Sequence, residues 1–192
     1  MRRSWARLLA LSAMSVVLPA FPASDEDLWK LLQDGGQVVL LRHAQSEQGV
    51  GEPPNMRLDD CSTQRNLSDS GRRQARALGE AVKAHHVSFD HVVSSPMCRC
   101  LDTAKLAFGR VDETQHAGSP RSGTEDQAKL VRDLRVLASE KHRGNVVVVS
   151  HARTIAAVTE LNPEPGEMIV VTPRGDGKFD IRGRLTPAAV PK

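Results

Sequence analysis

The sequence predicts an α/β fold of three layers, with helices on both faces of a mostly parallel sheet and a hairpin at one edge. The first observation is a pair of apolar runs at 37–41 and 145–149, each rich in Val or Leu and preceded by glycine. Short continuous runs of this kind are typical of strands buried on both faces, as in a parallel sheet. The second observation is that segments with helical spacing alternate with the strands, which is the order expected when helices cover both faces.

The N-terminal half of the chain begins this alternation. A short helix near residues 28–32 is expected to end at Gly35, and the first strand follows directly. The long loop at 44–66 comes next, and loops of this length inside a compact domain are usually functional or disordered. Ser68 then caps a helix that extends to about residue 86, with apolar residues on one face.

The C-terminal half continues the pattern. A strand at 91–94 meets Ser95 and Pro96, and a serine cap with proline in the first helical position marks the start of a helix. The later elements are, in order, a loop at 109–123, a helix at 125–139, a strand that ends at His151, a helix at 154–161 and an edge hairpin formed by 167–172 and 178–184.

The first 23 residues are expected to be a secretory signal peptide and not part of the fold. Three arginines precede the apolar stretch 8–18, and small residues follow it. The stretch is shorter than the roughly 20 residues that span a bilayer. We therefore expect export to the periplasm with no stable membrane insertion after cleavage, a single domain at 24–186 and a frayed tail at 187–192. The cleavage position stays open.

The charge balance argues against a nucleic-acid partner. The whole chain carries 26 Lys and Arg against 23 Asp and Glu, a net charge of +3. The first 23 residues hold three arginines and no acid, so the remaining domain is formally neutral. A neutral domain lacks the basic surface that binding to a phosphate backbone requires.

Three cysteines behind an export signal allow one disulfide. Cys98 and Cys100 are two residues apart and face different directions in a helix, so Cys61 is expected to pair with one of them. Cys98 is favoured, because Cys100 shares an apolar helical face with Met97 and Ala104.

Histidines and arginines gather where the predicted strands end. In open α/β sheets, ligands bind just beyond the carboxyl ends of the strands. Arginine presents a planar fork of donors that matches phosphate oxygens, and a neutral histidine can attack phosphorus without a separate base. These residues predict a site for a phosphoryl group, with no metal and no cofactor. The set is Arg42, His43, Arg65, Arg99 and His151.

Four sequence blocks, in order, resemble the histidine phosphatase superfamily, the relatives of phosphoglycerate mutase. The blocks are Leu-Arg-His-Ala at 41–44, Gln-Arg-Asn-Leu-Ser with the following Gly-Arg-Arg-Gln-Ala at 64–75, Ser-Ser-Pro-Met-Cys-Arg-Cys within 93–104, and Val-Ser-His at 149–151. The resemblance implies that His43 is the nucleophile and carries a transient phosphohistidine. It also implies that Arg42, Arg65, Arg99 and His151 bind the phosphate, with Arg42, Arg99 and His151 taking part in catalysis.

Departures from the family pattern narrow the expected function. Ala152 follows His151 where acid phosphatases and phytases have an aspartate, and the chain resembles small secreted phosphatases, including those similar to lipopolysaccharide-core heptose phosphatases. We expect an extracytoplasmic phosphomonoesterase that acts on a phosphorylated small molecule or cell-envelope component. The alternatives are a phosphotransferase or mutase of the same superfamily and a non-catalytic phosphate- or sugar-phosphate-binding protein. Four candidates for the leaving-group acid stay open: Glu125, Asp126, Asp60 and Glu167.

Overall fold

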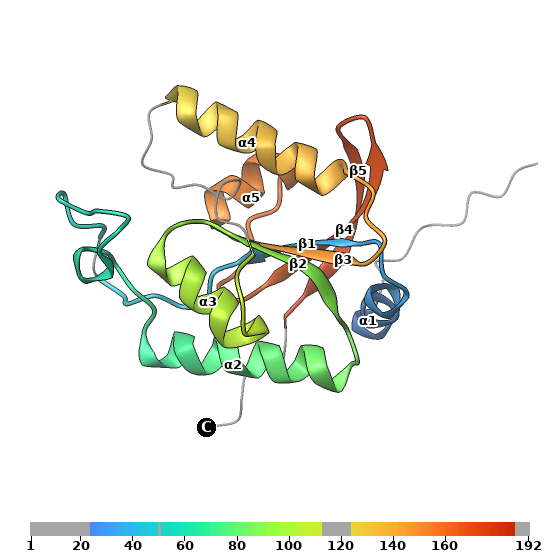
Figure 1. Ribbon diagram of the computed structural model, residues 1–192, viewed down its shortest axis with the longest axis horizontal. Coiled ribbons are helices and arrows are strands. Elements are labelled where there is room, and N and C mark those ends of the chain that lie inside the picture. Colours follow the sequence, from blue (N-terminus) through green and yellow to red (C-terminus); the bar gives the residue numbers. More distant parts are fainter. Residues whose placement is uncertain (1–23, 50, 113–123, 187–192) are drawn as a thin grey trace, which may run out of the picture.

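The computed structural model describes residues 24–49, 51–112 and 124–186 (Figure 1). The expected signal peptide at 1–23 and the tail at 187–192 lie outside these residues. The described part of the chain forms one five-stranded sheet with the spatial order β2-β3-β1-β4-β5. The strands are β1 (Val38–Arg42), β2 (Phe89–Ser94), β3 (Asn145–Ser150), β4 (Met168–Gly175) and β5 (Lys178–Leu185).

The sheet is mixed. β3 lies between β1 and β2 and runs parallel to both, whereas β4 is antiparallel to β1 and to β5. β4 is therefore antiparallel to the other four strands. Because it has two neighbours, two of the four neighbouring pairs are antiparallel. The expected edge hairpin is present, and its turn uses Asp176 and Gly177, which both have positive φ.

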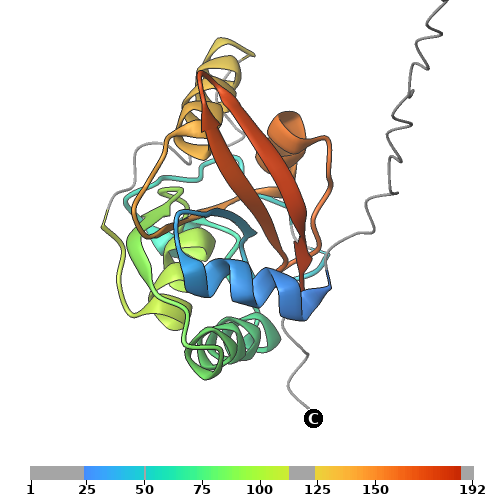
Figure 2. The ribbon, with the colours of Figure 1, turned by 90° about the vertical axis from the view of Figure 1, so that its right-hand side faces the viewer.

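Helices cover both faces of the sheet, which confirms the three-layer α/β/α prediction (Figure 1). In Figure 2, α1 lies across the end of the β4–β5 hairpin. None of the helices in the described part of the chain is long and apolar enough to cross a bilayer. The helices are α1 (Asp25–Asp34), α2 (Asp69–Ala84) and α3 (Cys98–Phe108) on one face, α4 (Thr124–Ser139) and α5 (Ala152–Thr159) on the other, and the short 3-10 helix η1 (Cys61–Thr63) in the loop before α2.

Alternating residues of the central strand feed two apolar cores. Val39 and Leu41 of β1 pack on the side of α1, α2 and α3, whereas Val38 and Leu40 pack on the side of α4 and α5. All four side chains are fully buried. Burial on both faces explains why the first four residues of the strand are all apolar and not only alternate ones.

The helix after β2 begins later than its sequence predicts. α3 starts at Cys98 with Met97 as its N-cap, and not at Ser95 and Pro96. The backbone N–H of Ser95 instead donates to the carbonyl of Val149 at 2.9 Å, which extends the strand pairing, and its hydroxyl bonds to the ring of His151 at 3.0 Å. The Ser95 hydroxyl therefore contacts the His151 ring and does not cap α3.

Candidate active site

The strand register brings the two candidate histidines together. Arg42 is paired with Ser150 across β1 and β3, and the backbone N–H of His43 donates to the carbonyl of Ser150 at 3.0 Å. The rings of His43 and His151 consequently lie edge to face with centroids 5.4 Å apart. Both residues are almost completely buried, with exposed fractions of 5% and 4%. The sequence expectation that these rings meet at one edge of the sheet is confirmed.

His43 is held in one tautomer. Its Nδ1 lies 2.8 Å from the carbonyl oxygen of Ala44, which can only accept, so Nδ1 carries the proton and Nε2 keeps its lone pair. The pKa of His43 is lowered to about 3, chiefly by burial and also by the nearby guanidinium groups, against the opposing effect of the hydrogen bond to Ala44. The ring is therefore neutral at physiological pH, which is the form that can act as a nucleophile.

His151 is enclosed by polar atoms of α3 and of the segment before it. Its Nε2 lies 3.0 Å from the hydroxyl of Ser95, and its Nδ1 lies 3.4 Å from an Nη2 donor of Arg99. The Sγ of Cys100 is 3.7 Å from Nε2. Burial, followed by the charge of Arg99, lowers the pKa of His151 well below its ordinary value, so this ring is also neutral without a bound anion.

Three arginines surround the histidines. Arg99 is 2% exposed, and Arg42 and Arg65 are half-buried. Arg42 donates from Nη1 to the carbonyl of Pro163 at 2.8 Å, and burial lowers the pKa of its guanidinium. Among the described residues, the Nε of each of the three is buried without a hydrogen-bond partner. Because unpaired buried donors are costly, these groups fit a site that binds an oxyanion.

A covalent link and an amide fix the Arg65 segment against α3. Cys61 forms the disulfide with Cys98, the pairing favoured from the sequence, and the Cα atoms are 5.7 Å apart. Gln64 accepts a hydrogen bond from the backbone N–H of Cys98 at 2.9 Å. Cys100 is the free, buried thiol, and burial raises its pKa to about 12, so it does not ionise at physiological pH. Arg65 and Arg99 are thus held on two segments that are bonded to each other.

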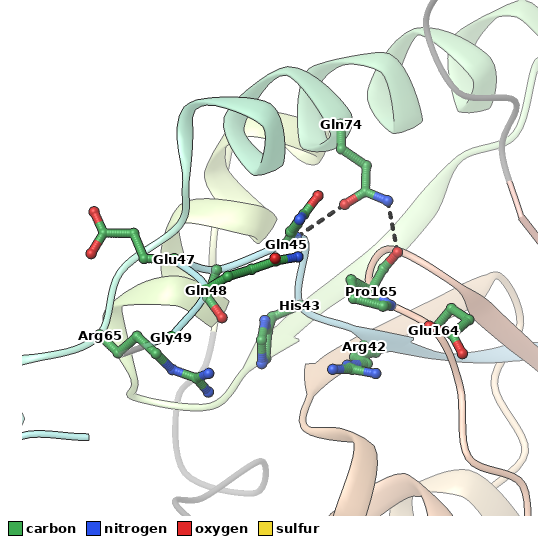
Figure 3. Close-up of a pocket in the computed structure, with 11 residues that line it drawn as sticks. Arg42, His43, Gln45, Glu47, Gln48, Gly49, Arg65, Gln74, Glu164 and Pro165 are labelled. Atoms are coloured by element: carbon green, nitrogen blue, oxygen red, sulfur yellow. Dashed lines mark hydrogen bonds between the residues drawn. The ribbon is translucent and has the colours of Figure 1, made fainter. Parts of the chain in front are cut away.

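A cavity of about 540 Å³ opens in front of His43. Figure 3 shows His43 near its centre, with Arg42 on one side and Arg65 on the other. Gln74 of α2 bridges two lining segments, since it accepts from the backbone N–H of Gln45 and donates to the carbonyl of Pro165. The rest of the lining consists of Ser46, Glu47, Gln48, Gly49 and Glu164. Amides and carboxylates therefore dominate the wall next to the arginines.

A sequence comparison tests the resemblance seen in the sequence blocks. A family model described as the histidine phosphatase superfamily (branch 1) matches residues 38–121, a range that includes Arg42, His43, Arg65 and Arg99. Over these residues the chain is similar to the histidine phosphatase superfamily. The match confirms the resemblance for the three sequence blocks inside this range. The block at 149–151 lies beyond it, and the narrower likeness to lipopolysaccharide-core heptose phosphatases stays a prediction. No curated protein matches the chain.

Solved structures share the fold of this chain at low sequence identity. The protein histidine phosphatase SixA in complex with tungstate has a TM-score of 0.56 at 18% identity and covers 79% of this chain and 97% of its own. A phosphoserine phosphatase from Entamoeba histolytica, in complex with phosphoserine, has a TM-score of 0.55 at 17% identity, with coverages of 77% and 95%. The putative phosphohistidine phosphatase SixA from Agrobacterium tumefaciens has a TM-score of 0.51 at 19% identity, with coverages of 79% and 99%.

Two of the four candidates for the leaving-group acid form ion pairs with arginines outside the predicted site. Asp60 pairs with Arg57 at 2.6 Å and caps η1, and the hydrogen bonds from Ser62 lower its pKa, the opposite of what a proton donor needs. Glu167 is buried, accepts from the backbone N–H of Glu164 at 2.7 Å and pairs with Arg184 at 3.2 Å. The side chains of Glu125 and Asp126 lie outside the described residues.

One carboxylate at the site, Glu52, escaped the sequence reasoning. It accepts a direct hydrogen bond from Nη1 of Arg99, and the backbone N–H of Arg65 donates to it at 3.3 Å. It lies in the loop before η1, where no helical or strand periodicity indicates which residues point inward. The weak available signal was the length of the 44–66 loop, which is typical of a functional loop but selects no residue within it.

Proposed function

We propose that the protein is an extracytoplasmic phosphomonoesterase that hydrolyses phosphate esters through a phosphohistidine on His43. The observation that carries this proposal is the state of the His43 ring. The carbonyl of Ala44 holds the proton on Nδ1, so the lone pair of Nε2 is available beside the cavity, and buried guanidinium groups lie on either side. A neutral imidazole in a ring of cations is suited to attack a phosphoryl dianion whose charge those cations offset.

The reaction has two steps. In the first, Nε2 of His43 forms a bond to phosphorus as the bond to the ester oxygen breaks, and the leaving oxygen takes up a proton from solvent. The Nδ1–H bond to Ala44 then stabilises the charge that develops on the ring. In the second step, water attacks phosphorus and gives up a proton to solvent, the P–N bond breaks with its electron pair returning to His43, and inorganic phosphate leaves. Arg42, Arg65 and Arg99 bind the phosphoryl oxygens in both steps.

The proposed substrate is a phosphorylated small molecule or a phosphorylated component of the cell envelope. The cavity next to His43 is lined by amide and carboxylate side chains such as Gln45, Gln74 and Glu164, which hydrogen-bond to hydroxyl or amino groups on a leaving group. Proteins with similar folds include a protein histidine phosphatase and a phosphoserine phosphatase. This likeness supports a phosphatase over a mutase.

The proposed location is the periplasm. The Cys61–Cys98 disulfide supports a compartment that permits disulfides, and the sequence pattern of residues 1–23 supports export. Mass spectrometry of the protein isolated from its host tests this location. A mature N-terminus near residue 24 together with an oxidised cysteine pair is expected, whereas an intact Met1 with three free thiols would contradict export.

The substitution His43→Ala tests the function. With an activated aryl phosphate, the wild type is expected to turn over and His43→Ala to lose nearly all of that turnover, because the group that would form the bond to phosphorus has been removed. The matched control is His91→Gln, which changes an exposed histidine on β2. Binding of phosphate by the wild type without any turnover would instead support a non-catalytic phosphate-binding protein. Turnover that survives in His43→Ala would exclude His43 as the nucleophile.

A further inference from the structure

We propose that Glu52 is the counter-anion of the phosphate pocket: its carboxylate holds Arg99 and Arg65 in the free protein and competes with phosphate for them. The proposal rests on the phosphatase function and adds a residue that sets the affinity of the site for phosphate and vanadate. In this role Glu52 is a positioning residue for the two arginines and takes no part in bond making.

The contacts of Glu52 lead to this role. Its Oε1 accepts a hydrogen bond from Nη1 of Arg99 and lies 3.9 Å from Nε of Arg65, and its Oε2 accepts from the backbone N–H of Arg65 at 3.3 Å. One carboxylate therefore joins both arginines. The side chain of Glu52 is 18% exposed and that of Arg99 is 3% exposed, so water screens this contact weakly.

Other carboxylates near the site lack this contact. Glu47 and Glu164 line the cavity, and Glu164 acts on Arg42 through its charge. Among the described residues, Glu52 is the acid that forms an ion pair with Arg99 or Arg65. A change at Glu52 therefore addresses these two guanidinium groups selectively.

The charge balance of the pocket gives the physical reason. Three guanidinium groups surround two histidines that burial keeps neutral, so these arginines carry a formal charge of +3, of which Glu52 offsets one unit through its contacts with Arg99 and Arg65. A buried cation without a partner is strongly destabilising, and the carboxylate removes that cost while no anion is bound. A phosphoryl dianion matches the same donors and repels a neighbouring carboxylate, so binding of the dianion displaces Glu52 from Arg99.

The variant Glu52→Gln tests the proposal, because it keeps the shape and removes the charge. Inorganic phosphate binding by calorimetry and orthovanadate inhibition of aryl phosphate hydrolysis are measured for both proteins. We expect Glu52→Gln to bind both anions about tenfold or more tightly, since a negative charge a few ångströms from the bound anion has been removed. Glu52→Ala is expected to shift the two constants in the same direction. A purely structural role would weaken anion binding.

The matched control is Asp59→Asn. It removes one negative charge from the same loop, but Asp59 is 86% exposed and contacts Arg57 instead of the pocket arginines. Its phosphate and vanadate constants are expected to stay at the wild-type values. If Asp59→Asn binds phosphate and vanadate as tightly as Glu52→Gln does, the effect comes from overall charge, and the specific role of Glu52 is contradicted.

Two further outcomes would overturn the proposal. The first is unchanged or weaker anion binding in both folded Glu52 variants. The second is a loss of turnover confined to alkyl phosphates with unchanged phosphate binding, which would make Glu52 the proton donor to the leaving group. Failure of the phosphatase function is recognised separately, since the wild type would then hydrolyse no aryl phosphate. If the wild type hydrolyses the aryl phosphate but the Glu52 variants do not bind phosphate or vanadate more tightly, only the counter-anion role of Glu52 is contradicted.

Discussion

Arg99 is the most buried of the three pocket arginines, and its guanidinium contacts both Glu52 and the ring of His151. It lies in the first turn of α3, whose apolar residues pack against the sheet. A planar fork at this position reaches two partners at once, and a compact ammonium cannot do so. The choice of arginine is therefore a geometric requirement as well as an electrostatic one.

The substitution Arg99→Lys is expected to lower kcat/KM for an aryl phosphate by about 10² to 10³, the loss typical of one preorganised donor in a charge-stabilising site. Steady-state kinetics measure the effect. Arg72→Lys is the control. Arg72 on α2 pairs with Asp102 and is not part of the cavity lining, and the substitution keeps the positive charge. Loss of less than about threefold in Arg99→Lys would contradict a direct role in binding the phosphoryl group.

Single residues at strand ends were predictable from the sequence, whereas a loop residue was not. His43 and His151 follow apolar runs whose geometry fixes where the next side chain lies, and the structure places their rings together. Arg99 was expected among the phosphate-binding residues, and its deep burial was not evident, because burial there depends on the loop that covers it. Glu52 supplies that cover, and no local pattern marks it.

At the scale of elements, α2 packs unusually closely against the chain that follows β1. A Cβ added at Gly71 would lie 1.8 Å from the carbonyl oxygen of Gln45, far inside contact distance. The same segment is tied to α2 through Ser68, whose backbone N–H donates to that carbonyl at 3.0 Å. Gln45 is two residues beyond His43, so this packing sets the path of the chain as it leaves the nucleophile.

The substitution Gly71→Ala is therefore expected to destabilise the fold by roughly 1 to 3 kcal/mol, the usual cost of overpacking, and to lower turnover as the His43 segment shifts. Urea unfolding and aryl phosphate hydrolysis measure the two effects. Gly51→Ala provides the comparison, since an added Cβ there meets no atom within 4 Å. Unchanged stability in Gly71→Ala would show that α2 and the loop can separate freely.

The disulfide joins the loop of Arg65 to the helix of Arg99 across a sequence separation of 37. The chain-entropy model gives about 4 kcal/mol for closing a loop of this length. Reduction is expected to cost roughly 2 to 4 kcal/mol in the free energy of unfolding and to raise KM, because the Arg65 segment loses its covalent attachment. Urea unfolding with and without reductant measures this cost. A Cys61→Ser/Cys98→Ser variant should no longer respond to reductant, and a wild type that responds no more than the variant would contradict the prediction.

At the scale of the whole molecule, two buried neutral histidines link stability to pH. The pKa of His43 is lowered to about 3 in the folded protein, and that of His151 is also lowered, against an unfolded value near 6.5. The unfolded chain therefore binds more protons below pH 6.5, so stability falls as pH decreases through 6.5. For His43 this amounts to about 2 kcal/mol lost between pH 7 and pH 5, and His151 adds a loss of the same sign.

Urea unfolding at these two pH values, in buffers without phosphate, measures the loss. The variant His43→Asn should lose the part of this difference that His43 contributes, about 2 kcal/mol, because that group with its lowered pKa is gone. An identical pH dependence in wild type and variant would mean that His43 titrates equally in the folded and unfolded states, and would contradict its burial as a neutral ring.

The overall architecture was largely predictable, because strands buried on both faces leave a continuous apolar signature. The layers, the order of the elements and the edge hairpin all followed from that signal together with helical spacing. The direction of β4 relative to β1 was less accessible, since Met168–Val171, the part of β4 that pairs with β1, is as apolar and as buried as β1 itself. The start of α3 was misplaced because Ser95 serves the site and not the helix cap.

The most direct measurement is the identity of the phosphorylated residue during turnover. The protein is mixed with an aryl phosphate, quenched at alkaline pH to preserve phosphohistidine, digested and sequenced by mass spectrometry. The account predicts one phosphoryl group on the peptide that contains His43, and none in His43→Ala. Turnover with the phosphoryl group on another residue, or with no phosphopeptide at any quench time, would contradict it.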